Sequence, residues 1–496
     1  MFLGIDVGTQ SVKALLYDAQ PRQVVDVQSA AVDLISKADG TREQLADWWL
    51  AALGACLAAF NRSDRSRVLA IGVSGQQHGF VPVAADGRVL APVKLWCDTS
   101  TLAECREITE AFGGEARCIA EVGNPILPGY TASKIRWLKK HRPGDYAQLA
   151  TILLPHDYLN FYLTGERVME CGDASGTGLL DIRRRTWHSG MLAAVDAERD
   201  LGQLLPPLAE SGAAIGQLRA DVAAELGLPA GIPVASGGGD NMMAAIGTGN
   251  VSAGRLTVSL GTSGTLFTSA DQPVVDPEGA LAAFCSSTGG WLPLLCTMNC
   301  TVSTELTRRL LALDIDALEH HAAAAPVGAQ GVMTLPFFNG ERSPDLPTGK
   351  ACIMGLDENN YSRENLLRSA MESTVYGLRL GLDALRAQGC AVESLRLTGG
   401  GAGSATWRQM VADIFNVPVS MQTVDEGAAL GAALQAAWMS QGARGGAVAL
   451  QQLVDAQLVL DPARSCEPRA ESVAAYDEHY RSYLRHVQTV GALYGA

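Results

Sequence analysis

Two short segments of the sequence place glycine and hydroxyl residues directly after an apolar run, a combination suited to binding phosphate. The first is Gly8–Ser11 and the second is Gly261–Gly264. Glycine lets the backbone approach a ligand closely, and successive backbone N–H groups in such a turn form a concave site for anions. Either segment alone is also consistent with an ordinary β-hairpin. Together, the two segments predict a clamp on the terminal phosphates of a nucleotide.

An acidic residue ends the apolar run before the first of these segments. Asp6 offers a carboxylate next to the expected phosphates. Mg²⁺ in proteins favours carboxylates, water and substrate phosphates, so Asp6 is a candidate ligand of that ion, directly or through water. A hairpin with a capping aspartate is the alternative interpretation of this residue.

A glycine triplet, 237–239, precedes a second acid after the apolar run 232–235. Asp240 and Asn241 follow the triplet at the expected strand tip, where a carboxylate can reach a bound hydroxyl. Phosphoryl transfer to an alcohol needs in-line positioning, neutralisation of the negative charge on the phosphate oxygens and one carboxylate that accepts the alcohol proton. Asp240 is our candidate for that catalytic base and for a second metal ligand. The alternative is a glycine-rich turn with an aspartate that caps a helix.

Polar residues also follow the apolar strand expected at 68–74. Gln77 and His78 offer hydrogen-bond donors and acceptors suited to a polyhydroxylated ligand, although a lone histidine is more often structural. Further on, Trp96 and Asp98 offer a ring face and a carboxylate. No cluster has zinc-ligand spacing, and neither G-x-x-x-x-G-K-[ST] nor G-x-G-x-x-G occurs.

Length, charge and cysteine usage limit the class of protein. The 496 residues exceed the size at which one hydrophobic core keeps growing, so two domains are expected. The net charge of −14 argues against a nucleic-acid partner or an anionic membrane. Eleven scattered cysteines are typical of reduced thiols. The first residues have no basic segment, and no apolar run reaches the ~18 residues of a membrane helix, so we expect a soluble cytoplasmic protein.

The pattern of apolar runs predicts an α/β protein with an internal repeat. Runs 2–6, 12–17 and 24–28 predict a three-stranded meander, and a helix with a Thr41/Gln44 capping box should follow it. The strand–turn–strand pattern returns 253 residues later, with Ser259 in the place of Asp6. Two domains of one topology would present two phosphate loops across a shared cleft. We place the division between 1–248 and 249–496, although any two hairpins resemble one another.

Near the end of the sequence, a strand at 394–398 leads into the glycine-rich segment 399–404 and a helix. Trp407, Met410, Val411 and Ile414 should share the buried face of that helix. A terminal helix is expected at 476–490. Glycine after a strand allows close approach of a planar or phosphorylated ligand, so the segment is a candidate for cradling adenosine.

Taken together, these segments resemble the FGGY carbohydrate kinases, a branch of the actin/hexokinase/Hsp70-like superfamily. The resemblance covers essentially the whole chain and is carried by residues 4–9, 129–137, 259–264, 338–344 and 397–402. It implies a two-domain, actin-like or ribonuclease H-like ATPase fold with a central cleft. It also implies ATP and Mg²⁺ as cofactors, a small-molecule sugar substrate and a possible homodimer.

The resemblance assigns roles to individual residues. It implies Asp240 as the catalytic base, with Gln77, His78 and Asn241 on the sugar. Asp6 and Asp240 stay our expected metal ligands. The residues expected to contact ATP are Gly8, Thr9, Gln10, Ser11 and Lys13, then Gly261, Thr262 and Ser263, and finally Gly399, Gly400, Gly401 and Ala402. Within the family, the Gln77-His78 and Asp240-Asn241 pairs are most like members that phosphorylate D-xylulose.

One position departs from the family pattern. Ser100 stands where members often carry arginine, and a hydroxyl does not reproduce the bidentate contacts of a guanidinium. Kinases for L-ribulose, L-fuculose, gluconate or erythritol are therefore alternatives. An actin- or Hsp70-like ATPase with a conformational output is another, but it has no use for Gln77-His78 facing a sugar.

Overall fold

The computed structural model describes residues 1–424, 426–443 and 449–494. The chain divides into two compact units, each discontinuous in sequence. Unit 1 comprises Met1–Val251, Ala270–Leu292 and Glu426–Leu458, and unit 2 comprises Ser252–Ser269, Pro293–Asp425 and Val459–Ala496. The predicted division into 1–248 and 249–496 assigned Ala270–Leu292 and Glu426–Leu458 to the second domain, whereas both segments belong to unit 1. The domain boundaries stay a prediction.

Unit 1 is built on a mixed sheet whose central strands are those expected at the start of the chain. The strands follow the order β14-β15-β6-β1-β2-β3, and the short strand β16 also pairs with β6. Their bounds are β1 Phe2–Val7, β2 Ser11–Asp18, β3 Gln23–Ala31, β6 Ala70–Gly75, β14 Ala214–Gln217, β15 Pro233–Ala235 and β16 Gly238–Gly239. β1, β2 and β3 are successively antiparallel, which confirms the predicted meander, whereas β1 and β6 are parallel.

Unit 2 contains a sheet with the same strand order and directions. From β20 the order is β20-β18-β17-β23-β24-β25, with β17 antiparallel to β18 and parallel to β23. The bounds are β17 Gly254–Leu260, β18 Gly264–Thr268, β20 Trp291–Thr297, β23 Val392–Thr398, β24 Val419–Gln422 and β25 Leu460–Cys466. The predicted repeat is therefore present as architecture.

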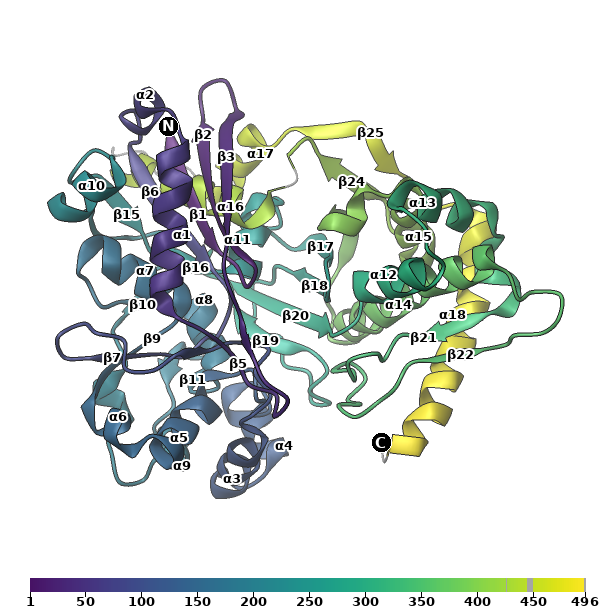
Figure 1. Ribbon diagram of the computed structural model, residues 1–496, viewed down its shortest axis with the longest axis horizontal. Helices are drawn as coiled ribbons and strands as arrows, with labels where there is room; N and C mark the ends of the chain where they lie inside the picture. Colours follow the sequence, from purple (N-terminus) through teal and green to yellow (C-terminus); the bar gives the residue numbers. More distant parts are fainter. Residues whose placement is uncertain (425, 444–448, 495–496) are drawn as a thin grey trace. The chain divides into compact units, whose positions relative to one another are not determined.

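Two helices of unit 1 pack on opposite faces of its sheet (Figure 1). Helix α1 (Ala46–Ala59) lies against β2 and β3, and helix α16 (Gly427–Ala443) lies against β1 and β6. Side chains alternate between faces along a strand, so Leu3 and Ile5 face the core under α1 while Gly4 faces α16. A Cβ atom at Gly4 would lie 1.9 Å from the carbonyl oxygen of Ala429. Glycine is thus required for α16 to approach the sheet this closely.

The predicted capping box before α1 is wrong. Gln44 ends a short strand, β5 (Arg42–Gln44), and Leu45 is the N-cap residue of α1. The Gln44 amide instead donates to the carbonyl of Thr9 at 2.8 Å and accepts from the indole N–H of Trp49 at 2.9 Å. The side chain is thus held by Thr9 and Trp49 and does not cap the helix, so the local spacing was misleading.

The later predicted elements are confirmed. Helix α15 (Ala405–Phe415) buries Trp407, Met410, Val411 and Ile414. Helix α18 (Ala470–Gly491) belongs to unit 2 and includes the predicted terminal helix. No helix among the described residues is both long and apolar enough to cross a membrane.

Among the remaining elements, β19 pairs with β20 at the edge of the second sheet, and the other strands form small separate sheets. The other helices are α2 Arg62–Arg65, α3 Leu102–Phe112, α4 Glu115–Val122, α5 Thr131–His141, α6 Pro143–Gln148, α7 Pro155–Thr164, α8 Cys171–Ala174, α9 Ser189–Val195, α10 Ala220–Leu226, α11 Asp240–Gly247, α12 Thr301–Leu310, α13 Ile315–Ala324, α14 Arg363–Ala387 and α17 Leu450–Gln457. The other strands are β4 Ile35–Ser36, β7 Val81–Ala84, β8 Val93–Lys94, β9 Leu149–Leu153, β10 Met169–Glu170, β11 Leu180–Asp181, β12 Thr186–Trp187, β13 Leu208–Ala209, β19 Ala282–Cys285, β21 Met333–Leu335 and β22 Cys352–Met354.

Candidate active site

Three of the predicted sugar-site residues lie together in unit 1. Asp240 is the first residue of α11 and directly follows β16, which pairs with the end of β6. Gln77 comes two residues after β6 ends, so this pairing brings it to Asp240. The Asn241 side-chain amide donates to Oε1 of Gln77 at 2.7 Å and to Oδ1 of Asp240 at 3.0 Å. The result is a connected row of one carboxyl and two amides at the strand ends.

Two further carboxylates influence Asp240. Burial, together with the negative charges of Asp6 and Asp173, raises the pKa of Asp240 to about 8. Asp6 lies on β1 opposite Ser74, whose hydroxyl donates to Asp6 Oδ1 at 2.7 Å. Burial also raises the pKa of Asp6. A buried carboxyl whose pKa is raised by a neighbouring carboxylate lies in an environment that favours a bound cation.

Metal binding by the protein alone has no support in the geometry. Within 1–424, 426–443 and 449–494, no group of three or more histidine, cysteine or acidic side chains is arranged to hold a metal ion. The carboxyls of Asp6 and Asp240 fit Mg²⁺ only with further oxygen ligands, such as phosphates and water.

His78 lies in the same region, surrounded by aromatic rings and one carboxylate. Its Nδ1 is 3.0 Å from Oδ1 of Asp173. The ring centroids of Tyr130 and Phe284 lie 5.3 and 5.2 Å from that of His78. A Cβ atom at Gly176 would lie 1.8 Å from the His78 ring, so this glycine leaves the space that the ring fills. His78 therefore has a tightly defined position.

The first predicted phosphate loop is held by side chains from other segments. The Thr9 hydroxyl donates to Oε1 of Gln76 at 2.9 Å and accepts from the indole N–H of Trp96 at 3.0 Å. The Gly8 N–H donates to the carbonyl of Ser11 across the turn at 3.0 Å. Trp96, predicted to contact the sugar, thus lies beside the phosphate loop. Gln76 is a supporting residue that sequence reasoning missed.

Two other predicted residues of unit 1 are engaged within the protein. Lys13 on β2 forms an ion pair with Glu426 at 2.7 Å. Asp98 is fully buried, and its carboxylate accepts from the backbone N–H of Arg42 at 2.8 Å and from the hydroxyl of Ser100 at 2.6 Å. Contacts of Lys13 with ATP and of Asp98 with a sugar stay predictions.

A buried lysine supplies the positive charge that Ser100 lacks. The Lys94 ammonium lies 2.8 Å from the Ser100 hydroxyl, 3.2 Å from Asp98 and 3.0 Å from Glu43. It also lies 4.0 Å from the ring centroid of Trp137. Asp98 and Glu43 therefore share the Lys94 ammonium as a cationic partner, without an arginine at position 100.

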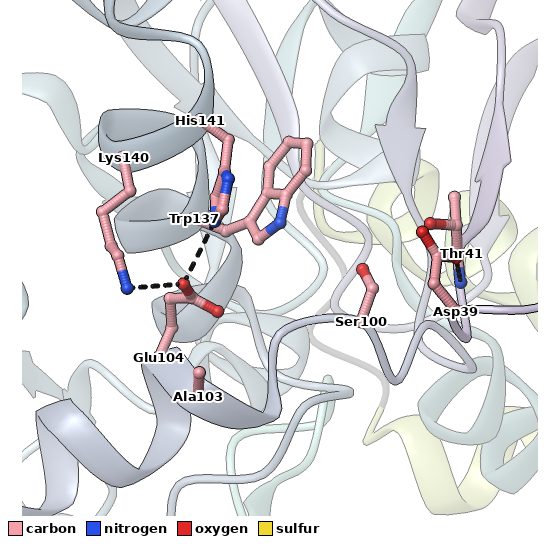
Figure 2. Close-up of a pocket in the computed structure, with 8 residues that line it drawn as sticks. All are labelled: Asp39, Thr41, Ser100, Ala103, Glu104, Trp137, Lys140 and His141. Carbon is pink, nitrogen blue, oxygen red and sulfur yellow. Dashed lines mark hydrogen bonds and ion pairs between the residues drawn. The ribbon is translucent and has the colours of Figure 1, made fainter.

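Ser100 also lines a pocket of about 410 Å³, together with residues such as Thr41, Glu104 and Trp137 (Figure 2). It contains none of the residues assigned to sugar or nucleotide. Three of its lining residues pair with one another, since Glu104 lies 2.9 Å from Lys140 and 3.4 Å from His141. The His141 ring stacks on Trp137, with centroids 4.9 Å apart.

The predicted nucleotide segments of unit 2 pack against each other. The carbonyls of Gly261 and Thr262 accept backbone N–H groups at the start of α12, at 2.9 and 3.0 Å. Gly399 has a φ of +85°, and a Cβ atom there would lie 2.8 Å from the Leu260 backbone. Gly399 and Gly400 are exposed, whereas Gly401 and Ala402 are buried. Glycine at 399 thus allows the adenosine segment to lie directly on the base of the second loop.

Duplicated sheets with a glycine-containing turn after the first strand of each copy define the actin-like ATPase fold. Within that class, the chain belongs to the FGGY family of carbohydrate kinases. The model of the family's N-terminal domain matches residues 1–247, and that of its C-terminal domain matches residues 256–440. Membership implies that ATP is the phosphoryl donor.

Individual relatives match over nearly their full length. A xylulose kinase from Haemophilus influenzae is 42% identical over 98% of this chain and 99% of its own. A xylulose kinase from Escherichia coli is 36% identical over 98% of this chain and 99% of its own. The crystal structure of xylulose kinase from Rhodospirillum rubrum, 26% identical, covers 100% of both chains with a TM-score of 0.88.

Proposed function

We propose that this protein transfers the γ-phosphoryl group of ATP to D-xylulose and produces D-xylulose 5-phosphate. One observation carries the proposal: the Asn241 amide bridges the Asp240 carboxyl and the Gln77 amide, so the proposed base and two proposed sugar-binding groups form one connected row. The identity to xylulose kinases at 42% and 36% over nearly whole chains supports the choice of sugar.

In this mechanism Asp240 receives the proton of the attacking hydroxyl. The sugar oxygen forms a bond to the γ-phosphorus while the bond to the β-phosphate oxygen of ATP breaks, and ADP leaves. The hydroxyl proton passes to the Asp240 carboxylate and from there to solvent. Phosphoryl transfer needs mainly alignment and charge stabilisation, so Gln77, His78 and Asn241 contribute by orienting the sugar.

Asp6 and Asp240 would hold Mg²⁺ together with phosphate oxygens. Bound there, the ion supplies neutralisation of the charge on the transferred phosphoryl group. The support for this assignment is that burial raises the pKa of both carboxyls and that the charge of Asp6 raises the pKa of Asp240 further. A divalent cation is the group that such a pair favours.

The nucleotide contacts that we propose come from segments in each unit. The first set is Gly8, Thr9, Gln10, Ser11 and Lys13, and the second is Gly261, Thr262, Ser263, Gly399, Gly400, Gly401 and Ala402. The first set is supported by the hydrogen bonds that Gln76 and Trp96 form with the Thr9 hydroxyl. Support for the second is the packing of Gly399 on Leu260.

A coupled assay of ADP release with a panel of polyols tests the substrate. We expect strong release with D-xylulose and mass-spectrometric detection of a pentose phosphate. Release with L-ribulose, L-fuculose, gluconate or erythritol but not D-xylulose would refute the choice of sugar. ADP release independent of every polyol would instead indicate an ATPase with a conformational output. A cytoplasmic homodimer stays a prediction, and light scattering during gel filtration tests the dimer.

A further inference from the structure

The backbone of His78 has an unusual conformation. Its φ is +59°, in the left-handed region that residues other than glycine rarely adopt. Such conformations persist where the surrounding structure holds them, and they gather at functional sites. The groups that hold the His78 backbone are therefore candidates for a role in the site.

Both backbone polar groups of His78 are held by buried side chains. Its N–H donates to Oδ1 of Asp173 at 3.1 Å. Its carbonyl accepts from the Lys134 ammonium and from the Thr131 hydroxyl, each at 3.0 Å. Lys134 and Thr131 are fully buried residues of α5, in the segment 129–137 that resembles a family signature. The structure thus explains why that segment contains a lysine.

Asp173 also determines which ring nitrogen of His78 carries the proton. Burial raises the pKa of Asp173, but contacts with His156 and His78 outweigh it and lower the pKa to about 2. An ionised carboxylate only accepts hydrogen bonds, so Nδ1 of His78, 3.0 Å away, must be the donor. In the neutral ring the acceptor is then Nε2.

The second oxygen of Asp173 lies beside the buried ring of His156. Nδ1 of His156 lies 3.3 Å from Asp173 Oδ2, and Nε2 of His156 lies 2.9 Å from Asp157 Oδ1. Burial lowers the pKa of His156, but the two aspartates together raise it well above its ordinary value. A buried row of side chains, Asp157–His156–Asp173, therefore leads to His78.

We propose that Asp173 is a positioning residue for sugar binding, which holds His78 in the Nδ1–H tautomer so that Nε2 accepts a hydrogen bond from a sugar hydroxyl. The proposal rests on the proposed function, in which His78 contacts the sugar. Lys134 and Thr131 also fix the position of His78, because both donate hydrogen bonds to its carbonyl. Asp173 acts through His78 and needs no contact with the substrate.

The Asp173→Asn variant separates this role from a merely structural one. The amide keeps the shape of the side chain, but its NH2 group can also donate to Nδ1 of His78 and so support the Nε2–H tautomer. We expect KM for D-xylulose to rise about 10-fold or more while KM for ATP is unchanged, as when a residue supporting a binding group is replaced. The control is Asp196→Asn, a buried aspartate of unit 1 paired with Lys139 at 2.8 Å, which should leave KM for the sugar unchanged. An unchanged KM in Asp173→Asn would refute the proposal.

A spectroscopic measurement decides the tautomer even where a variant folds poorly. The protein has eight histidines, so ¹⁵N-histidine labelling gives few ring signals, and His78→Gln identifies those of His78. We expect the Nδ1–H pattern in the unmodified protein. An Nε2–H pattern would overturn the proposal.

The two kinetic results distinguish failure of this inference from failure of the proposed function. His78→Gln should itself raise KM for the sugar. If it does not, His78 does not contact the sugar and the proposed site is wrong. If it does while Asp173→Asn does not, only the positioning role fails. Gly176→Ala is a further check, because its Cβ atom would lie 1.8 Å from the His78 ring and should raise KM by displacing it.

Discussion

Ser259 occupies in unit 2 the position that Asp6 occupies in unit 1. Asp6 lies opposite Ser74 on the neighbouring parallel strand, and Ser259 lies opposite Thr398 in the same way. The duplicated sheets thus share their geometry but differ in charge, because only the first copy retains the carboxylate. Asp240 supplies the second carboxyl at the site from a different element, the start of α11.

Replacing the proposed base should abolish most turnover. Asp240→Asn keeps the shape of the side chain but removes the proton acceptor, so we expect kcat to fall about 100-fold or more. ADP release measures this, and circular dichroism checks the fold. Near-normal turnover in a correctly folded variant would contradict the assignment.

Loss of the Asp6 carboxylate should affect the metal and nucleotide and spare the sugar. We expect Asp6→Ala to lose Mg²⁺-dependent ATP turnover, because the proposed cation loses one of its two protein carboxylates. Calorimetry should still detect binding of D-xylulose. Lost sugar affinity combined with intact turnover would disprove the metal-binding role.

The close approach of α16 to the sheet makes a specific prediction about stability. In Gly72→Ala the new Cβ atom would lie 2.0 Å from the carbonyl oxygen of Ala432, so the free energy of unfolding should fall by about 1–3 kcal/mol. Gly54→Ala in α1 is the matched control, because nothing lies within 4 Å of its Cβ atom. There we expect a gain of about 0.5–1 kcal/mol from helix propensity. Urea unfolding compares the two.

The buried charge of Lys94 should contribute strongly to stability. Lys94→Met leaves Glu43 and Asp98 without their cation, and breaking a buried ion pair typically costs about 3–5 kcal/mol. Arg88→Met is the surface control, since Arg88 and Asp86 are largely exposed. That pair should be worth about 0–1 kcal/mol. Equal effects in the two variants would show that Lys94 is not needed to balance this region.

Lys134 should make the free energy of unfolding depend on pH. Burial lowers the pKa of Lys134 to about 7, and the like charge of Lys94 acts in the same direction, while Asp98 and Asp173 oppose the shift. Between pH 7 and the ordinary lysine value of 10.5, the unfolded chain therefore binds more protons than the folded one. Stability should rise with pH across this window, by at most about 1.4 kcal/mol per pH unit.

Denaturant unfolding of the unmodified protein and of Lys134→Met at pH 7 and pH 9 tests this dependence. The advantage of the unmodified protein should be larger at the higher pH. A difference that stays constant would show that the Lys134 ammonium keeps its proton in the folded state.

Much of the fold was predictable because its signals are local. The meander, both glycine loops and the buried face of α15 follow from the spacing of apolar residues and turn residues along short stretches of chain. The candidate base was also recognisable locally, since Asp240 follows three glycines at a strand end. The family motifs were likewise contiguous, which is why they identified the class of protein.

The strands, the loops, the repeat and the candidate acids could all be predicted from the order of residues along the chain. Tertiary structure alone decided which distant residues meet: Asp173 with His78, Lys94 with Ser100 and Asp98, and α16 with the first strand of the chain. Local periodicity records which face of an element is buried. Hydrogen bonds and ion pairs between segments depend instead on how the sheet and its helices pack, and no spacing along the chain encodes that.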